Sequence, residues 1–171
     1  MEEGPEERYD RILREHGASL RRVAALYEAE RSRREDLFQE ICLALWLARP
    51  RFRGESSERT FVFRIAHNRG LTHGWRQGRA KPLDLEQVQA VPDPRPDPEA
   101  AAAAQQRRER LGEAIAGLPL GQRQVLALVL EGLSQREAAE VLGLTENNVA
   151  VRLNRARQAL RQVMGGEGGS R

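Results

Sequence analysis

The sequence predicts an all-α fold made of two small helical domains: an N-terminal helical bundle and a C-terminal helix-turn-helix domain, joined by a proline-rich linker. Three observations support this fold. Apolar residues recur at helical spacing along most of the chain. The segment VPDPRPDPEA, in which proline alternates with charge, interrupts that spacing. Near the C-terminus, two short helical patterns are separated by a glycine, and each follows a capping residue.

The domain boundaries follow these changes in composition. We expect the N-terminal domain over residues 6–78, the linker over 79–97, the helix-turn-helix domain over 98–164 and a disordered tail over 165–171. At ~3.3 Å per residue the linker reaches at most ~60 Å, so the two domains could contact DNA nearly two helical turns apart.

Charge is distributed along the chain in blocks. Residues 49–81 hold nine basic and two acidic residues, residues 82–104 hold one basic and five acidic residues, and residues 147–164 hold four arginines and no carboxylate. Two basic blocks that flank an acidic one favour two separate contacts with a polyanion.

Composition also argues against several functions. Cys42 is the only cysteine, so no intramolecular disulfide can form and a reducing cytoplasm fits. The three histidines are scattered, so we expect no metal and no cofactor. No apolar run approaches the ~20 residues of a membrane span, and the acidic start MEEGPEERYD is unlike a signal peptide. We find no nucleophile–base pair or phosphate loop, so we do not expect an enzyme.

The first helical pattern runs from about Glu6 to Glu30, and Gly17 is expected to divide it into two pieces. A further helix starts near Ser32 or Arg33 and runs to about Arg49, because Pro50 stops it. Its apolar face carries Leu37, Phe38, Ile41, Ala44 and Leu45.

The opposite face of this helix mixes polar groups with two leucines. It carries Asp36, Gln39, Glu40, Leu43 and Leu47. A mixed stripe of this kind is typical of a protein-contact surface. The alternative is that a loop or a neighbouring helix covers Leu43 and Leu47.

The segment PRFRGESSER reads as an exposed loop, in which Phe52 stands between Arg51 and Arg53. An aromatic flanked by guanidinium groups suits an unstacked base, although such a residue more often pins a loop to the core. A helix from Ser57 or Thr60 to Gln77 follows. Its buried stripe is expected to be Phe61, Val62, Ile65 and Ala66.

A second stripe on that helix has the composition of a nucleic-acid-reading surface. It carries Arg64, His67, Asn68, Leu71 and Trp75. We expect His67 to be a polar surface residue with no further role. After the linker, a helix begins at Pro98, with Leu111, Ala114, Ile115 and Leu118 facing its core, and a shorter helix spans about Gly121 to Glu131.

A helix-turn-helix is predicted by the pattern of caps and apolar residues within Leu133–Arg157. Ser134 stands at an N-cap position, and Glu137 follows at the spacing of a capping box. Gly143 suits the left-handed conformation at a helix end, and Thr145 is a second N-cap. The second helix of such a motif can enter the DNA major groove.

The face of that second helix turned away from the core is rich in amide and guanidinium groups, which pair with adenine and guanine edges. At ~100° per residue, it holds Asn147, Asn148, Val151, Asn154, Arg155 and Gln158. The flanking arginines suit phosphates; they are Arg152, Arg157 and Arg161. The alternative is an ordinary helical hairpin with a polar solvent face.

The two halves together resemble an extracytoplasmic-function (ECF) RNA polymerase sigma factor, with sigma regions 2 and 4 and no region 3. In the N-terminal half the resemblance rests on DLFQE, ALWLARPRFRGESSERTF and RIAHN, and in the C-terminal half on LPLGQRQVLALVLEGLSQREAAEVLGLTENNVAVRLNRARQAL. It covers nearly the whole chain, from about Ile12 to Leu160, in the family's order.

The resemblance implies a cytoplasmic protein that binds core RNA polymerase at its clamp helices and flap. Such a protein directs promoter-specific initiation by recognising the minus-thirty-five duplex and by melting and capturing the minus-ten element as a single strand. The resemblance leaves open whether an anti-sigma factor also binds. Two alternatives remain: a helix-turn-helix regulator that acts without polymerase, and an all-helical protein-interaction module.

The resemblance also implies roles for particular residues. The polymerase-binding candidates are Asp36, Gln39, Glu40 and Leu43. The minus-ten candidates are Phe52, Arg53, Phe61, Arg64 and Asn68. With the face derived above, the minus-thirty-five candidates are Asn147, Asn148, Ala150, Val151, Arg152, Asn154, Arg155 and Arg157. Phe61 stands where the family usually has tryptophan. Ala150 stands where the family commonly has a basic residue, so Asn154 and Arg155 become the main candidates for base contacts on this helix.

Overall fold

The computed structural model describes residues 4–76 and 98–165, and for residues 98–101 it describes the backbone alone. Within these ranges the chain forms seven α-helices and one short 3-10 helix, with no strand. The predicted all-α class is therefore confirmed. The predicted linker over 79–97 lies outside the described residues. Of the predicted tail over 165–171, only Gly165 is described, and it is the last residue of the final helix.

The N-terminal domain consists of three packed helices. They are α1 (Pro5–Tyr27), α2 (Arg31–Ala48) and α3 (Glu58–Arg76), with the 3-10 helix η1 (Arg49–Arg51) after α2. Their buried side chains include Leu20, Val23, Leu37, Ile41, Leu45, Val62 and Phe63. Of the predicted stripe on α3, Val62 and Ala66 are buried, and Phe61 and Ile65 are only partly covered. The fully buried Phe63 was not in that predicted stripe.

The prediction that Gly17 divides the first helix was wrong, because α1 is continuous. Ile12 and Leu20, on either side of Gly17, are both buried. A glycine inside a helix costs about 1 kcal/mol relative to alanine. Packing of the apolar face on both sides of Gly17 outweighs a penalty of that size.

Ion pairs and hydrogen bonds fix α3 against α1 at both ends. Near the start of α3, Glu58 accepts hydrogen bonds from Arg8 Nε at 3.0 Å and from Arg11 Nη1 at 2.7 Å. Near its end, His73 Nε2 lies 3.1 Å from Glu28 Oε2, and both side chains are more than nine-tenths buried. The orientation of α3 is therefore set from two sides.

The C-terminal domain contains four helices: α4 (Pro98–Ala116), α5 (Leu120–Leu130), α6 (Gln135–Leu142) and α7 (Glu146–Gly165). Helices α4, α5 and α6 all pack on α7. Leu118 is buried, whereas Leu111, which was expected to face the core, is 39% exposed.

The turn between α6 and α7 is built as the sequence predicts. Ser134 and Glu137 form a complete capping box at the start of α6. Gly143 takes a left-handed conformation with φ of 65°, where residues with a Cβ are disfavoured. Thr145 Oγ1 accepts a hydrogen bond from the Asn148 N–H at 3.2 Å. The helix-turn-helix geometry is thus fixed locally by its own caps.

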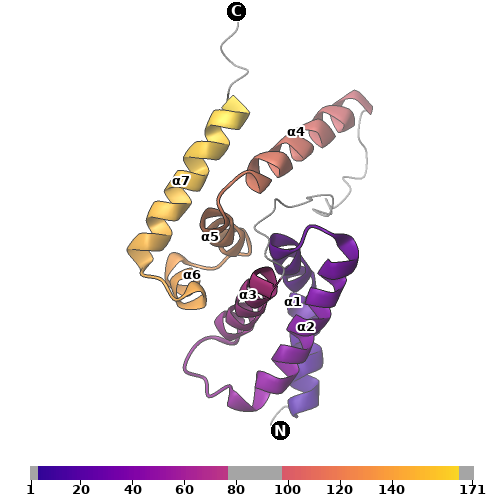
Figure 1. Ribbon diagram of the computed structural model, residues 1–171, viewed down its shortest axis with the longest axis vertical. Coiled ribbons are helices and arrows are strands. Elements are labelled where there is room, and N and C mark those ends of the chain that lie inside the picture. Colours follow the sequence, from indigo (N-terminus) through magenta and orange to yellow (C-terminus); the bar gives the residue numbers. More distant parts are fainter. Residues whose placement is uncertain (1–3, 77–97, 166–171) are drawn as a thin grey trace, which may run out of the picture.

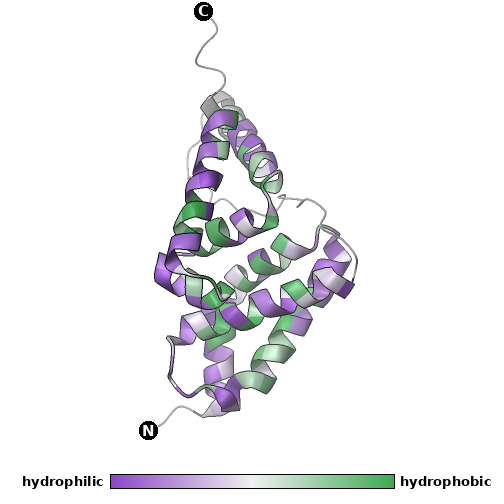
Figure 2. Cartoon of the chain, turned by 60° about the vertical axis from the view of Figure 1, so that its left-hand side comes forward, coloured by the Kyte–Doolittle hydropathy of each residue, from purple (hydrophilic) through white to green (hydrophobic). Residues whose placement is uncertain are grey.

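The two domains pack against each other. Helix α6 lies beside α3, and α5 approaches α1 (Figure 1). Buried apolar side chains from both domains form one cluster. Figure 2 shows apolar residues gathered where helices face one another and polar residues on the outer surfaces. The relative placement of the two domains is therefore part of the fold.

Candidate polymerase-binding and DNA-binding surfaces

The predicted protein-contact face lies on the outer side of α2. Asp36 and Gln39 are exposed, and Glu40 is partly covered. Leu43 and Leu47 are 58% and 64% exposed. The alternative that a neighbouring element covers the two leucines is therefore not what the fold shows. Two exposed leucines beside acids and an amide form a surface suited to a protein partner.

The loop after η1 brings two candidate aromatic residues together. The rings of Phe52 and Phe61 have centroids 5.0 Å apart and planes inclined by 57°. The guanidinium of Arg8 lies 5.0 Å from the centre of the Phe52 ring. Both rings are half-buried, and Arg53 next to them is exposed. Phe52 thus pins the loop to α3 and leaves part of an aromatic surface open.

The candidates on α3 continue from this aromatic pair along one side of the helix. Phe61, Arg64 and Asn68 follow at intervals of three and four residues, which places them on one face. Asn68 is exposed, and the Arg64 Nε is buried without a hydrogen-bond partner among the described residues. Trp75, the last residue of the predicted stripe, is 80% exposed. The stripe therefore ends in an uncovered aromatic ring.

His67 does not belong to this open surface, and its predicted surface position was wrong. Its side chain is 1% exposed. Tyr27 OH lies 2.7 Å from His67 Nδ1, and Gln124 Nε2 of α5 donates to that hydroxyl at 2.8 Å. The side chain faces α1 and the second domain, which helical spacing within one segment does not reveal.

The candidate reading face of α7 is open to solvent. Val149, Leu153 and Ala156 turn inward and are buried. The exposed candidates are Asn147, Asn148, Val151, Asn154, Arg155 and Arg157. Amide and guanidinium groups on one exposed helix face can pair with base edges in a major groove. Ala150, on the flank, is partly covered.

Arg152 is held differently from the other arginines of α7. Its Nε donates to Asn148 Oδ1 at 2.9 Å. Its guanidinium also lies against Gly121 of α5, where an added Cβ would come within 2.6 Å of Nη1. Arg152 therefore supports Asn148 and the α5–α7 contact as well as offering positive charge.

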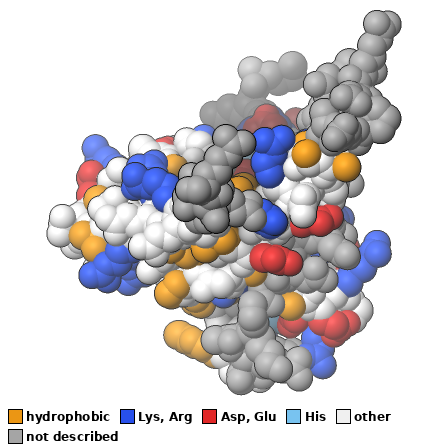
Figure 3. Space-filling model, turned by 90° about the horizontal axis from the view of Figure 1, so that it is seen from above, with side chains coloured by type: hydrophobic (Ala, Val, Ile, Leu, Met, Phe, Trp, Pro, Cys, Tyr) orange, Lys and Arg blue, Asp and Glu red, His pale blue; other side chains and the backbone are white. Residues whose placement is uncertain are grey.

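Charged side chains are dispersed over the surface seen from above. In Figure 3, Arg side chains alternate with carboxylates and uncharged groups rather than forming a single patch. On the side of the molecule shown in Figure 3, DNA binding would therefore depend on the faces of individual helices more than on one broad basic surface.

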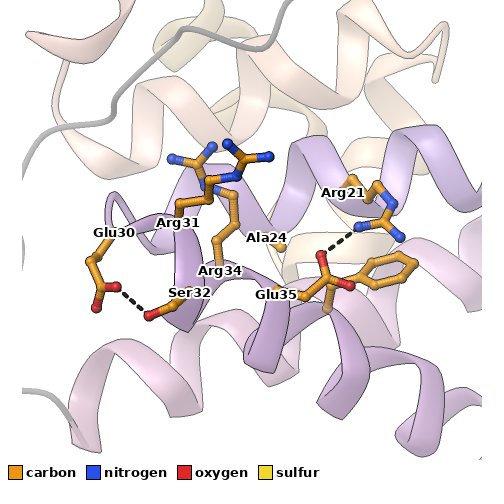
Figure 4. Close-up of a pocket in the computed structure, with 8 residues that line it drawn as sticks. Arg21, Ala24, Glu30, Arg31, Ser32, Arg34 and Glu35 are labelled. Carbon is orange, nitrogen blue, oxygen red and sulfur yellow. Dashed lines mark hydrogen bonds and ion pairs between the residues drawn. The ribbon is translucent and has the colours of Figure 1, made fainter.

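A hollow lies where α1 meets α2 (Figure 4). Its lining comprises Arg21, Ala24, Glu30, Arg31, Ser32, Arg34, Glu35 and Phe38. Arg21 pairs with Glu35 at 2.6 Å, and Arg34 donates to the carbonyl oxygens of Glu28 and Ala29. These two arginines serve mainly to join the helices, and none of the predicted site residues lines the hollow.

Residues 4–76 and 98–165 contain no group of three or more His, Cys, Asp or Glu side chains placed to hold a metal ion. None of the helices described is both long and apolar enough to cross a bilayer.

Comparisons with known proteins identify the family. Residues 12–80 match the model for Sigma-70 region 2, and residues 108–160 match the model for Sigma-70, region 4. The ECF RNA polymerase sigma factor RpoE of Cereibacter sphaeroides is 33% identical over 135 residues, which cover 78% of this chain and 73% of that protein. The chain belongs to the ECF RNA polymerase sigma factors.

Two solved structures share the fold of this ECF sigma factor. CnrH, in complex with the cytosolic domain of CnrY, has 24% identity and a TM-score of 0.65, covering 94% of this chain and 89% of that one. RpoE from Bartonella quintana, in complex with the anti-sigma factor NepR, has 20% identity and a TM-score of 0.71, covering 94% and 99%. Region 2 thus corresponds to α1–α3, and the region 4 match begins within α4 and ends in α7.

Proposed function

We propose that this sigma factor binds core RNA polymerase through α2 and reads promoter DNA at two places. The observation that carries the proposal is the presence of three separate exposed faces in one chain: the α2 face with Leu43, the Phe52–Phe61 surface leading along α3, and the amide-rich face of α7. One face suits a protein, and the other two suit nucleic acid.

On α2, the proposed polymerase contacts are Asp36, Gln39, Glu40 and Leu43, directed at the clamp helices. The C-terminal domain would contact the flap. We place these activities in domains spanning residues 6–78 and 98–164, with 79–97 as the linker and 165–171 as the tail. The chain works in the cytoplasm, where polymerase is, and an anti-sigma factor is a further proposed partner.

At the minus-thirty-five element, α7 would enter the major groove and read base edges. Its proposed contacts are Asn147, Asn148, Ala150, Val151, Arg152, Asn154, Arg155 and Arg157. At the minus-ten element, unpaired bases of one strand would lie along Phe52, Arg53, Phe61, Arg64 and Asn68. Extruding a base costs a few kcal/mol, which stacking and phosphate contacts would offset. Catalysis belongs to the polymerase, so this chain itself is not an enzyme.

The test is to add the purified full chain to core polymerase and transcribe a library of genomic fragments in vitro. We expect transcripts that start at a shared promoter motif only when the chain is present. Tight duplex binding by the isolated chain, without polymerase affinity, would instead favour a helix-turn-helix regulator. If replacing Arg152, Arg155 and Arg157 changes neither promoter-dependent transcription nor DNA binding, a protein-interaction module is favoured.

A single exposed amide tests the α2 assignment. Gln39→Ala is expected to weaken binding to core polymerase about tenfold, since central interface residues commonly contribute ~1 kcal/mol or more. Binding can be measured by fluorescence anisotropy. Gln105→Ala, which removes an exposed amide from α4, is the matched control. Equal affinity for the two variants would remove Gln39 from the proposed surface.

A further inference from the structure

The two domains are connected by polar contacts that the proposed promoter-binding surfaces do not use. Glu131, at the C-terminal end of α5, accepts hydrogen bonds from Ser19 Oγ at 2.6 Å and from Arg22 Nη2 at 2.9 Å. Arg22 Nε also donates to the second carboxylate oxygen, so the ion pair is bidentate. The Glu131 side chain is only 15% exposed. Bidentate pairs of this kind are among the stronger charged contacts in proteins.

A second arginine of the N-terminal domain reaches the same place. Arg59, in the first turn of α3, has its Nη1 3.5 Å from the carbonyl oxygen of Gly132. Its positive charge also acts on Glu131 and Glu137. Gly132 has a φ of 82°, and a Cβ there would lie 3.2 Å from Arg59 Nη2. The α5–α6 junction thus brings carboxylates and a backbone carbonyl to two arginines.

Beside the shared apolar cluster, the contact between the domains also buries polar groups, and these are incompletely satisfied. Gln124 of α5 donates to Tyr27 OH. The neighbouring Arg123 is 6% exposed, and its Nε and Nη1 have no hydrogen-bond partner within the described part of the chain. A buried guanidinium with unpaired donors opposes closure, and opening would hydrate it. Such an interface is suited to reversible opening rather than to permanent burial.

We propose that the α5–α6 junction, with Glu131 at its centre, is an intramolecular ligand for the basic surface formed by Arg22 and Arg59, and that it holds the free chain closed. In the closed form the α2 and α7 faces stay exposed, whereas these two arginines are occupied. Opening releases the two arginines and separates the two domains. Any effect of this closure on transcription initiation rests on the proposed sigma function, whereas the closure itself can be tested without it.

Charge reversal tests the closure on the full chain. A compact protein of this length has a radius of gyration of about 16 Å, and small-angle X-ray scattering should give the wild type a value close to it. Glu131→Arg and Arg22→Glu should each raise the radius by several ångströms. The double variant, which restores an ion pair with exchanged partners, should bring it back. Glu140→Arg, on the exposed side of α6, is the matched control and should leave it unchanged.

An unchanged radius in both single variants, or a double variant as expanded as they are, would overturn the proposal. Far-UV circular dichroism checks that the variants remain helical. Should a reversal variant lose helicity, the neutral Glu131→Gln and Arg22→Gln are measured in its place, and expansion is again expected.

Binding to core polymerase separates this proposal from the proposed function. The opened single variants should bind polymerase at least as tightly as the wild type, because the interdomain contacts no longer have to be broken before the two domains engage the clamp helices and the flap. If the radii respond as expected but no form binds polymerase, the sigma function fails and the closure stands. If polymerase binds but the radii do not respond, the closure is wrong and the sigma function stands.

Discussion

At the scale of single residues, burial changes the chemistry of His67. Burial lowers its pKa to about 3, because the imidazolium cannot be solvated in the interior. His67 is therefore neutral in the folded protein at neutral pH. Gln124 donates to Tyr27 OH, so the hydroxyl proton is available for donation to His67 Nδ1.

This burial predicts a pH dependence of stability. Below about pH 6.5, the ordinary pKa of histidine, the unfolded chain binds a proton that the folded chain does not bind until about pH 3. Stability should therefore fall as the pH drops from 6.5, by about 2 kcal/mol at pH 5 from this group. Urea unfolding at pH 7 and pH 5 measures the loss.

Two variants assign that loss. His67→Gln cannot titrate, so its difference in unfolding free energy between pH 7 and pH 5 should be smaller than that of the wild type by about 2 kcal/mol. Tyr27→Phe removes the hydrogen bond but keeps His67 buried, so it should retain the wild-type difference. Identical pH dependence in His67→Gln and the wild type would contradict the assignment.

Arg155 carries a residue-scale prediction for DNA reading. Its guanidinium is exposed on the same face as Asn154. If it pairs with a base edge, Arg155→Ala should cost roughly 1–3 kcal/mol at one base position and relax specificity there. Affinities for a set of single-base promoter variants measure this. Uniform weakening on all sequences, as expected for the control Arg161→Ala, would show that Arg155 contacts only phosphate.

At the scale of elements, two glycines inside helices have opposite surroundings. An added Cβ at Gly17 of α1 would meet no atom within 4 Å outside its own helix. An added Cβ at Gly70 of α3 would lie 2.2 Å from Tyr27 Cδ2. The first glycine therefore only weakens its helix, whereas the second allows α3 to approach the Tyr27 ring.

Replacing each of these two glycines by alanine should therefore have opposite effects on stability. Gly17→Ala should stabilise the protein by about 0.5–1 kcal/mol, because alanine is the better helix former. Gly70→Ala should destabilise it by roughly 1–3 kcal/mol, because the Tyr27 ring must move. Denaturant unfolding of the two variants measures both. A Gly70→Ala variant as stable as the wild type would show that the close approach of α3 to Tyr27 is not rigid.

At the scale of the whole molecule, the shared apolar cluster and the Glu131 contacts couple the two domains. The wild type should therefore unfold in one cooperative transition, and Glu131→Arg should separate it into two. Differential scanning calorimetry measures the number of transitions. Two transitions in the wild type at neutral pH would show that the domains are energetically independent.

The sequence by itself determined the helices, the helix-turn-helix and the outward faces of α2 and α7. Apolar spacing, Ser134, Glu137, Gly143 and Thr145 act within a few residues of one another, so they can be recognised along the chain. For the same reason the sequence could place Leu43 on the outward face of its helix. It could not show whether a loop or a neighbouring helix covers that face. The roles of these faces in binding remain predictions.

Only the tertiary structure decided what lies between the elements. It made α1 continuous through Gly17, placed Phe52 on Phe61, buried His67, and joined Arg22 to Glu131 across 109 positions of sequence. Each of these outcomes depends on how helices dock, and docking energy is shared among side chains that are distant in the chain. Helical spacing shows which side of a helix is apolar, but not which helix covers it.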